Sequence, residues 1–157
     1  MTYFTDKVAV ITGAGSGTGR LLAHHLGAAG SRLSLADVNA ENLGIVAAEL
    51  HSHGVEVHSC VVDVFDRAAF AACAKDVSAQ FGVVHQLYNN AGLSGGSRFL
   101  VDTPYDVIDK VLAVNLGGVI NGTKEFLPRL ITSNDGHLIN VSSLNGIIAQ
   151  PRFAAYA

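Results

Sequence analysis

Short apolar runs alternate with longer amphipathic stretches along the chain. Residues 40–54 show the longer type, because Leu43, Val46, Ala47 and Leu50 recur at the spacing of one helical face. The short runs are rich in β-branched residues and end at glycine or polar residues, as buried strands do. Five strands are predicted, at residues 7–12, 32–37, 55–63, 83–89 and 137–142. The predicted order of elements is β-α-β-α-β-α-β-α-β.

Local signals mark several helix ends. Asn39 and Asp66 directly precede amphipathic segments and are predicted N-caps. Thr103 and Pro104 are predicted to be the N-cap and the first residue of a further helix. That helix is expected to run to about residue 132, with a bend where residues 115–118 read NLGG.

Strands that alternate with helices imply a parallel sheet covered by helices on both faces. Right-handed crossovers then give an α/β doubly wound fold, and a Rossmann fold with strand order 3-2-1-4-5 is expected. No linker or repeat interrupts the pattern, so one domain over residues 1–157 is predicted. Within these residues the fifth strand would be an open edge. Val119, Phe126 and Leu130 on the last helix are expected to be exposed.

Composition narrows the classes of function. The chain has 157 residues, 49% of them hydrophobic, and a net charge of −3 without a basic run, so nucleic acid and anionic membranes are not expected partners. No signal peptide and no membrane-spanning run is recognised, and a cytoplasmic location is expected. Cys60 and Cys73 are expected to be reduced thiols in the core. The seven histidines show no metal-ligand spacing.

Polar and glycine-rich segments follow every predicted strand. They are TGAGSGTG at 12–19, Asp37, Asp63, NNAG at 89–92 and the serine pair at 142–143. Parallel strands place their carboxyl ends at one edge of the sheet, where ligands bind in open α/β folds. Five such features on one edge predict an elongated binding site.

The glycine loop after the first strand has a physical reason to bind a dinucleotide. Gly13, Gly17 and Gly19 let the chain turn sharply into a helix, and they let a diphosphate approach the helix N-terminus. A plain glycine-rich turn is the alternative, and the downstream acid disfavours it. A phosphate loop of the nucleoside triphosphatase type is excluded, because Arg20 stands where that motif needs lysine.

Asp37 follows Gly19 at the place expected for an acid that binds the adenosine ribose. A carboxylate there would repel a 2′-phosphate, and neither Val38 nor Asn39 offers a positive charge. NAD is therefore favoured over NADP. The alternative is that Asp37 only caps a helix or stabilises a turn.

Together these motifs resemble the short-chain dehydrogenase/reductase family in its classical form. Residues 12–19 fit the pattern T-G-x-x-x-G-x-G, and 89–92 fit N-N-A-G. Residues 115–118 fit N-L-x-G, and Ser143 precedes Tyr156 by the 13 residues that separate the serine and tyrosine of the family. The resemblance implies these cofactor-binding residues: Thr12, Gly13, Gly15, Ser16, Gly17, Thr18, Gly19, Asp37, Asp63, Val64, Asn90, Ala91 and Gly92.

The resemblance also implies hydride transfer between a nicotinamide and an alcohol or ketone. Tyr156 would be the general acid and base, Ser143 would hydrogen-bond the substrate oxygen, and Asn115 would hold a water in a proton relay. Each residue has a plainer alternative, namely a half-buried aromatic, a turn cap and a polar residue at a helix bend. The full-length form is expected to be a homo-oligomer.

Two departures from the family pattern bear on these roles. Thr18 stands where the family usually has an aliphatic residue, and its hydroxyl is expected to alter slightly how the first helix packs. The family lysine, which helps the tyrosine to lose its proton, would fall at position 160. The helix and the strands that follow the tyrosine in the family are also missing from residues 1–157, so the predicted domain is expected to be incomplete. The 157-residue chain alone is therefore expected to be nearly inactive. A non-catalytic dinucleotide-binding module and a regulatory partner of a full-length homologue are the alternatives.

Overall fold

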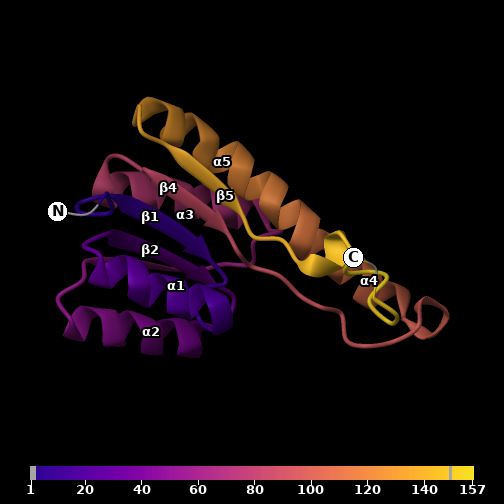
Figure 1. Cartoon of the computed structure of the whole chain (residues 1–157). Helices are drawn as coiled ribbons and strands as arrows, with labels where there is room; N and C mark the ends of the chain where they lie inside the picture. Colours follow the sequence, from indigo (N-terminus) through magenta and orange to yellow (C-terminus); the bar gives the residue numbers. More distant parts are fainter. Residues whose placement is uncertain (1–2, 149) are drawn as a thin grey trace.

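The computed structural model describes residues 3–148 and 150–157, and these form a parallel sheet between two layers of helices (Figure 1). The strand order is β3-β2-β1-β4-β5. The strands are β1 (Val8–Thr12), β2 (Arg32–Asp37), β3 (Val57–Val61), β4 (Gln86–Asn89) and β5 (His137–Asn140). The predicted fold class and strand order are confirmed. The sequence pattern overestimated the lengths of β3, β4 and β5.

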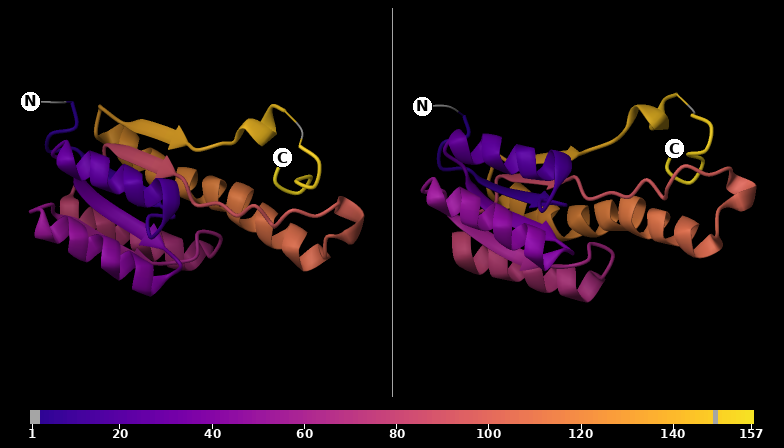
Figure 2. Two further views of the ribbon diagram at one scale, coloured as in Figure 1. Left: turned by 60° about the horizontal axis from the view of Figure 1, so that its bottom comes forward. Right: turned by 90° about the horizontal axis from the view of Figure 1, so that it is seen from below.

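Within the described residues, five α-helices connect or follow the strands. They are α1 (Gly17–Ala28), α2 (Ala40–Ser52), α3 (Arg67–Phe81), α4 (Tyr105–Leu112) and α5 (Val119–Thr132). Short 3-10 turns occupy Leu100–Asp102 and Leu144–Gly146. A π-helical segment, Ala113–Gly118, joins α4 to α5. The segment includes residues 115–118, where a bend of the long helix was predicted, and α4 extends beyond the sheet (Figure 2).

The alternation of side chains along β1 divides the core into two layers. Ala9 and Ile11 face α1 and α2 in one buried cluster, whereas Val8 and Val10 face α3 and α5 in the other. All four side chains are fully buried. Because the strand has a buried layer on each face, its sequence is a continuous apolar run.

Two of the predicted helix caps are confirmed and one is wrong. The side chain of Asn39 accepts a hydrogen bond from the amide of Asn42, and that of Asp66 accepts one from Ala69. Thr103 does not cap α4, since its hydroxyl donates instead to the carbonyl of Phe99 at 2.9 Å. Its hydroxyl thus closes the preceding turn.

The exposed face of α5 differs from the expected one. Phe126 and Leu130 are buried, and the Phe126 ring packs edge-on against Phe70 of α3 with centroids 5.9 Å apart. The helix α3 covers this face of α5, and periodicity along α5 alone does not indicate that partner. The exposed apolar side chains of this region are instead Leu116, Ile120, Leu127 and Ile131, and Val119 is half-buried.

Cys60 and Cys73 are joined by a disulfide, which corrects the expectation of two reduced thiols. Cys60 lies on β3 and Cys73 on the buried face of α3, and their Cα atoms are 6.1 Å apart. That separation lies within the range that a disulfide can bridge.

None of the described helices is long and apolar enough to cross a membrane.

Candidate functional site

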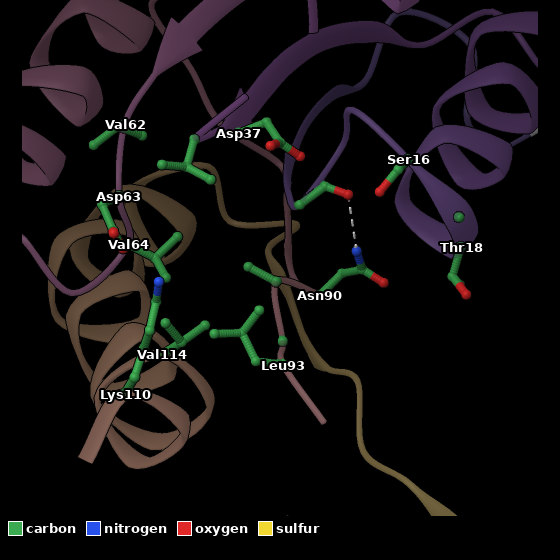
Figure 3. Close-up of a pocket in the computed structure, with 15 residues that line it drawn as sticks. Ser16, Thr18, Asp37, Val62, Asp63, Val64, Asn90, Leu93, Lys110 and Val114 are labelled. Atoms are coloured by element: carbon green, nitrogen blue, oxygen red, sulfur yellow. Dashed lines mark hydrogen bonds between the residues drawn. The ribbon is translucent and has the colours of Figure 1, made fainter. Parts of the chain in front are cut away.

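Two neighbouring cavities lie beyond the carboxyl ends of the strands. The first is a cleft of about 490 Å³ lined by the glycine loop, the ends of β2, β3 and β4, and one side of the long helix (Figure 3). The second has about 420 Å³. Thr18 and residues 90–93 line both cavities, so an elongated ligand can pass from one into the other. The predicted edge of the sheet is thus where the structure places a site.

The glycine loop is so tight that it leaves no space for side chains at two positions. A Cβ on Gly19 would lie 2.1 Å from the carbonyl oxygen of Gly13 and 2.7 Å from the side-chain nitrogen of Asn90. Gly13 has φ +66°, and a Cβ there would lie 2.9 Å from the Cα of Ala91. Only glycine permits this approach of the loop to the end of β4.

Thr12 and Asn90 fasten that loop to β4. The Thr12 hydroxyl accepts hydrogen bonds from the amides of Asn90 (2.9 Å) and Ala91 (3.0 Å). In return, the Asn90 side chain donates to the carbonyl of Thr12 at 2.9 Å. Thr12 is buried and lines neither cavity, as is also true of Gly15 and Gly19. Thr12, Gly15 and Gly19 therefore support the loop without lining the cleft. The other ten predicted cofactor-binding residues line it.

Asp37 connects the glycine loop to the end of β2. One carboxylate oxygen accepts from the amide of Gly15 at 2.8 Å, and the other accepts from the amide of Asn39 at 2.9 Å. Asp37 also lines the cleft. A carboxylate oxygen can accept more than one hydrogen bond, so the same group remains able to bind ribose hydroxyls.

Asp63 and Val64 form the far wall of the cleft, and the long helix packs closely behind them. A Cβ on Gly118 would lie 2.5 Å from a methyl of Val64, so only glycine fits at that place in the helix. Asn121 is 8% exposed, and its side chain donates to the carbonyls of Val64 (3.0 Å) and Phe65 (3.3 Å). The sequence analysis missed Asn121, although a polar residue on the apolar face of a helix was a signal.

Asn115, Ser143 and Tyr156 all line the second cavity. Ser143 accepts a hydrogen bond from the amide of Asn145 at 3.2 Å, and Tyr156 is half-buried with its ring near that of Phe153. Among the described residues, no hydrogen bond joins the three predicted catalytic side chains to one another. The structure therefore brings them to one cavity, and their roles stay predictions.

Both polar atoms of the Asn115 side chain are already engaged. The oxygen accepts from the amide of Leu93 at 2.8 Å, and the nitrogen donates to the carbonyl of Leu93 at 2.9 Å. Asn115 lies in the π-helical turn, which presents its side chain to the segment after β4. Each atom still has one hydrogen-bonding position left, so the side chain can also bind a water.

Thr18 differs from its expected role. Its side chain is exposed at the start of α1 and faces the two cavities, so it does not disturb how that helix packs. Figure 3 shows it next to Ser16, with the hydroxyl directed away from the helix. Lys110 of α4 also lines the cleft and was not singled out by the sequence.

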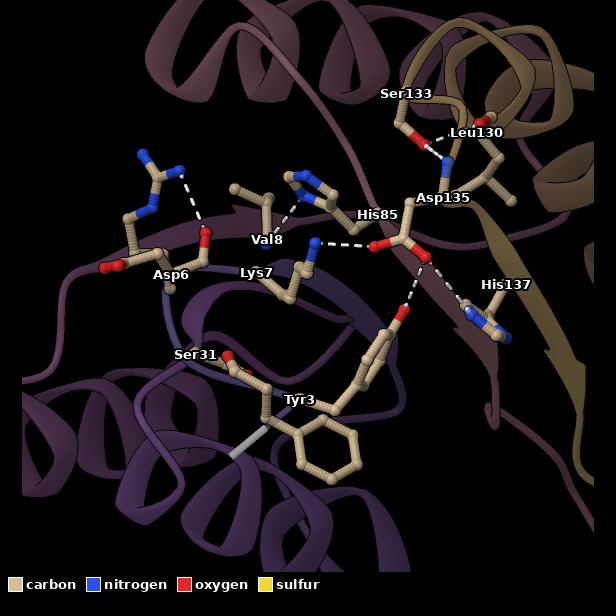
Figure 4. Close-up of polar contacts among 12 residues, drawn as sticks. Tyr3, Asp6, Lys7, Val8, Ser31, His85, Leu130, Ser133, Asp135 and His137 are labelled. Carbon is tan, nitrogen blue, oxygen red and sulfur yellow. Dashed lines mark hydrogen bonds and ion pairs between the residues drawn. The ribbon is translucent and has the colours of Figure 1, made fainter. Parts of the chain in front are cut away.

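A separate polar cluster lies at the opposite ends of the strands (Figure 4). Lys7 forms an ion pair with Asp135 at 2.5 Å, and the Tyr3 hydroxyl donates to Asp135 at 3.2 Å. The hydrogen bond between Lys7 and Asp135 lowers the pKa of the Asp135 carboxyl and raises that of the Lys7 ammonium. This cluster connects β1 to the turn before β5 and is not part of the site. No group of three or more His, Cys, Asp or Glu among the described residues is placed to hold a metal ion.

Comparisons with known proteins agree with this geometry. The family described as short chain dehydrogenase matches residues 7–157. SadH of Mycobacterium tuberculosis, which is named as an oxidoreductase, is 46% identical in an alignment of 157 positions that covers 99% of this chain and 56% of SadH. The C alpha-dehydrogenase of Sphingobium sp. strain SYK-6 is 40% identical in an alignment of 158 positions that covers 100% of this chain and 52% of that protein.

A solved structure has the same fold over nearly all of the chain. The crystal structure of NAD+-bound xylitol dehydrogenase superposes with a TM-score of 0.95 at 34% identity, covering 99% of this chain and 60% of that one. The chain spans about half the length of the curated relatives it matches. The match over residues 7–157, the strand order and the glycine loop lead to one conclusion: the chain belongs to the short-chain dehydrogenase family.

Proposed function

We propose that the chain is the dinucleotide-binding part of an oxidoreductase that uses NAD in preference to NADP. The observation that carries this proposal is the position of Asp37, whose carboxylate lines the cleft while both its oxygens hold backbone amides. Those hydrogen bonds fix the carboxylate where the adenosine ribose of a dinucleotide would lie. The NAD+-bound state of the related xylitol dehydrogenase structure supports a nicotinamide dinucleotide.

The cleft fits such a cofactor along its length. Glycine backbone at the N-terminus of α1 can receive a diphosphate, because the first amides of a helix have no partner within it. Next to Asp37, Val38 is 66% exposed and carries no charge. A 2′-phosphate would meet the Asp37 carboxylate without a nearby cation on β2, so NADP should bind more weakly.

The second cavity would hold an alcohol or ketone next to the nicotinamide. A bound nicotinamide supplies hydride transfer, and the protein supplies binding and orientation. In this proposal Tyr156 exchanges a proton with the substrate oxygen, and Ser143 hydrogen-bonds that oxygen. Asn115 positions the segment after β4, since its side chain holds both backbone groups of Leu93.

Titration of the 157-residue chain with NADH and NADPH, followed by cofactor fluorescence, tests the binding proposal. We expect NADH to bind more tightly than NADPH. In the variant Asp37→Asn the difference between the two affinities should become smaller, because the substitution removes the repulsion between the carboxylate and a 2′-phosphate. Asp76→Asn is the matched control, since Asp76 is exposed on α3 and lines neither cavity. Equal affinities of the wild-type chain for NADH and NADPH would refute the preference.

A second candidate is a module that binds the dinucleotide without turning it over. The observation in its favour is that the cleft is held by its own hydrogen bonds, whereas none joins the three catalytic candidates among the described residues. We expect the 157-residue chain to bind NADH but to oxidise alcohols slowly, if at all. A rapid NAD-dependent oxidation of secondary alcohols by this chain would exclude the module and favour the enzyme.

A further inference from the structure

Lys110 is a charged residue of the cleft that no sequence motif identifies. It lies on α4 and lines the cleft together with Val114, which is one helical turn further along. Residues four positions apart share a face of a helix. The Lys110 ammonium is the only positive charge among the described residues that line the cleft, where Asp37 and Asp63 contribute two carboxylates.

The orientation of Lys110 directs its ammonium into the cleft. Figure 3 shows its side chain lying beside Val114 with the nitrogen toward Asp63 and Val64. A lysine stem can lie along apolar side chains while its head stays in contact with water or a polar ligand. The Lys110 side chain forms no ion pair within 4.0 Å and no hydrogen bond with a described residue, so its three N–H donors are available.

The position along the cleft identifies which part of a dinucleotide Lys110 can reach. The glycine loop marks the diphosphate, and Asp37 marks the first ribose. Asp63, Val64, Val114 and Lys110 lie beyond Asp37, at the end away from the second cavity. That end is where the purine base would lie, between apolar walls formed by the two valines.

We propose that Lys110 is a cofactor-binding residue that donates a hydrogen bond to an acceptor nitrogen on the purine ring of the dinucleotide. The purine has ring nitrogens that accept and an exocyclic amine that donates. The ammonium of Lys110 and the carboxylate of Asp63 therefore supply one donor and one acceptor to the same base. This inference rests on the proposed function and adds to it a residue that selects for the base.

Fluorescence titration with NADH and competition with AMP test the inference. Lys110→Met keeps an unbranched apolar stem and removes the ammonium. We expect it to lower the affinity for both ligands by about 3- to 10-fold, which corresponds to the net free energy of one accessible hydrogen bond. Lys110→Arg keeps donors and charge and should restore most of the affinity. Lys75→Met on α3 is the matched control and should bind as the wild type does, because Lys75 is exposed and lines neither cavity.

Each outcome has one meaning. Equal losses of affinity for NADH and AMP in Lys110→Met, with affinity regained in Lys110→Arg, support a contact with the AMP half of the dinucleotide, which carries the base. Unchanged affinities in Lys110→Met, with a wild-type chain that binds NADH, overturn this inference and leave the proposed function standing. A lower affinity for NADH with an unchanged affinity for AMP also overturns the inference, since the contact would then lie elsewhere on the dinucleotide. A wild-type chain that binds neither ligand removes the proposed function and this inference together.

Discussion

Gly19 offers the strictest test of how the site is built. The structure leaves no space for its Cβ, which would lie 2.1 Å from the carbonyl oxygen of Gly13 and 2.7 Å from the side-chain nitrogen of Asn90. The first contact is with backbone, so no rotation of a side chain can relieve it. In Gly19→Ala the loop must move away from β4, and the hydrogen bond from Asn90 to Thr12 must lengthen or break.

The expected cost follows from that overlap. Forcing an extra methyl into a packed site costs about 1–3 kcal/mol, and so close a backbone contact belongs at the upper end. Alanine regains about 1 kcal/mol of helix propensity over glycine. We therefore expect Gly19→Ala to lose about 2 kcal/mol, which lowers Tm by about 4–8 °C in a chain of this length. NADH binding should weaken by more than about tenfold, since the loop amides move.

Gly44→Ala is the matched control for thermal unfolding and NADH titration. Gly44 is exposed inside α2, and a Cβ there has nothing within 4 Å. The same substitution should therefore stabilise the chain by about 0.5–1 kcal/mol and leave NADH binding unchanged. If Gly19→Ala matches or exceeds the wild-type Tm and binds NADH within about twofold, the account of the loop is wrong.

Three further predictions concern stability away from the cleft. Phe126→Ala should lower the free energy of unfolding in urea by about 3–5 kcal/mol, because the ring is fully buried. Asp135→Asn should flatten the pH dependence of Tm below about pH 4. The Asp135 carboxyl has a folded pKa lowered chiefly by Lys7, so its stabilisation is present above the unfolded pKa and is lost as pH falls through the folded one. Reduction of the Cys60–Cys73 disulfide, which closes a loop with a sequence separation of 13, should lower stability by about 3 kcal/mol in the chain-entropy model, as a shift of the urea midpoint would show.

Each of these three has a comparison that isolates its cause. Ile131→Ala also shortens an apolar side chain of α5, but at 71% exposure it should change stability little. Asp102→Asn removes an exposed carboxylate that has no side-chain partner among the described residues, and it should keep the wild-type pH profile. A reducing agent should not affect a Cys73→Ser variant. If a variant and its control change stability, or its pH dependence, by the same amount, the physical reason given for that variant is wrong.

The sequence was sufficient where structure depends on neighbours along the chain. The spacing of Leu43, Val46 and Leu50 predicted the buried face of α2, and all three side chains are buried. The N-caps Asn39 and Asp66 act on amides three residues away, so their signal is local. The doubly wound architecture followed from the alternation of strands and helices and from right-handed crossovers, although these rules alone are compatible with more than one strand order.

The failures concern contacts between distant segments. Burial of Phe126 depends on Phe70 of another helix, and the disulfide depends on a strand and a helix meeting side by side. Periodicity within one helix cannot show which face its neighbours cover. Lys110 was missed for the same reason, since it reaches the cleft only because α4 passes beside the end of β3.

The segment after β4 is where the two cavities meet, because residues 90–93 line both of them. On the side of the first cavity Thr12 holds the amides of Asn90 and Ala91, and on the side of the second cavity Asn115 holds both backbone groups of Leu93. The wall shared by the two cavities is thus fixed from β1 and from the long helix. A change at Asn115 should therefore move the wall of the first cavity as well as that of the second. If the proposed enzyme function holds, a loss of turnover in an Asn115 variant is not by itself evidence of a chemical role for this side chain.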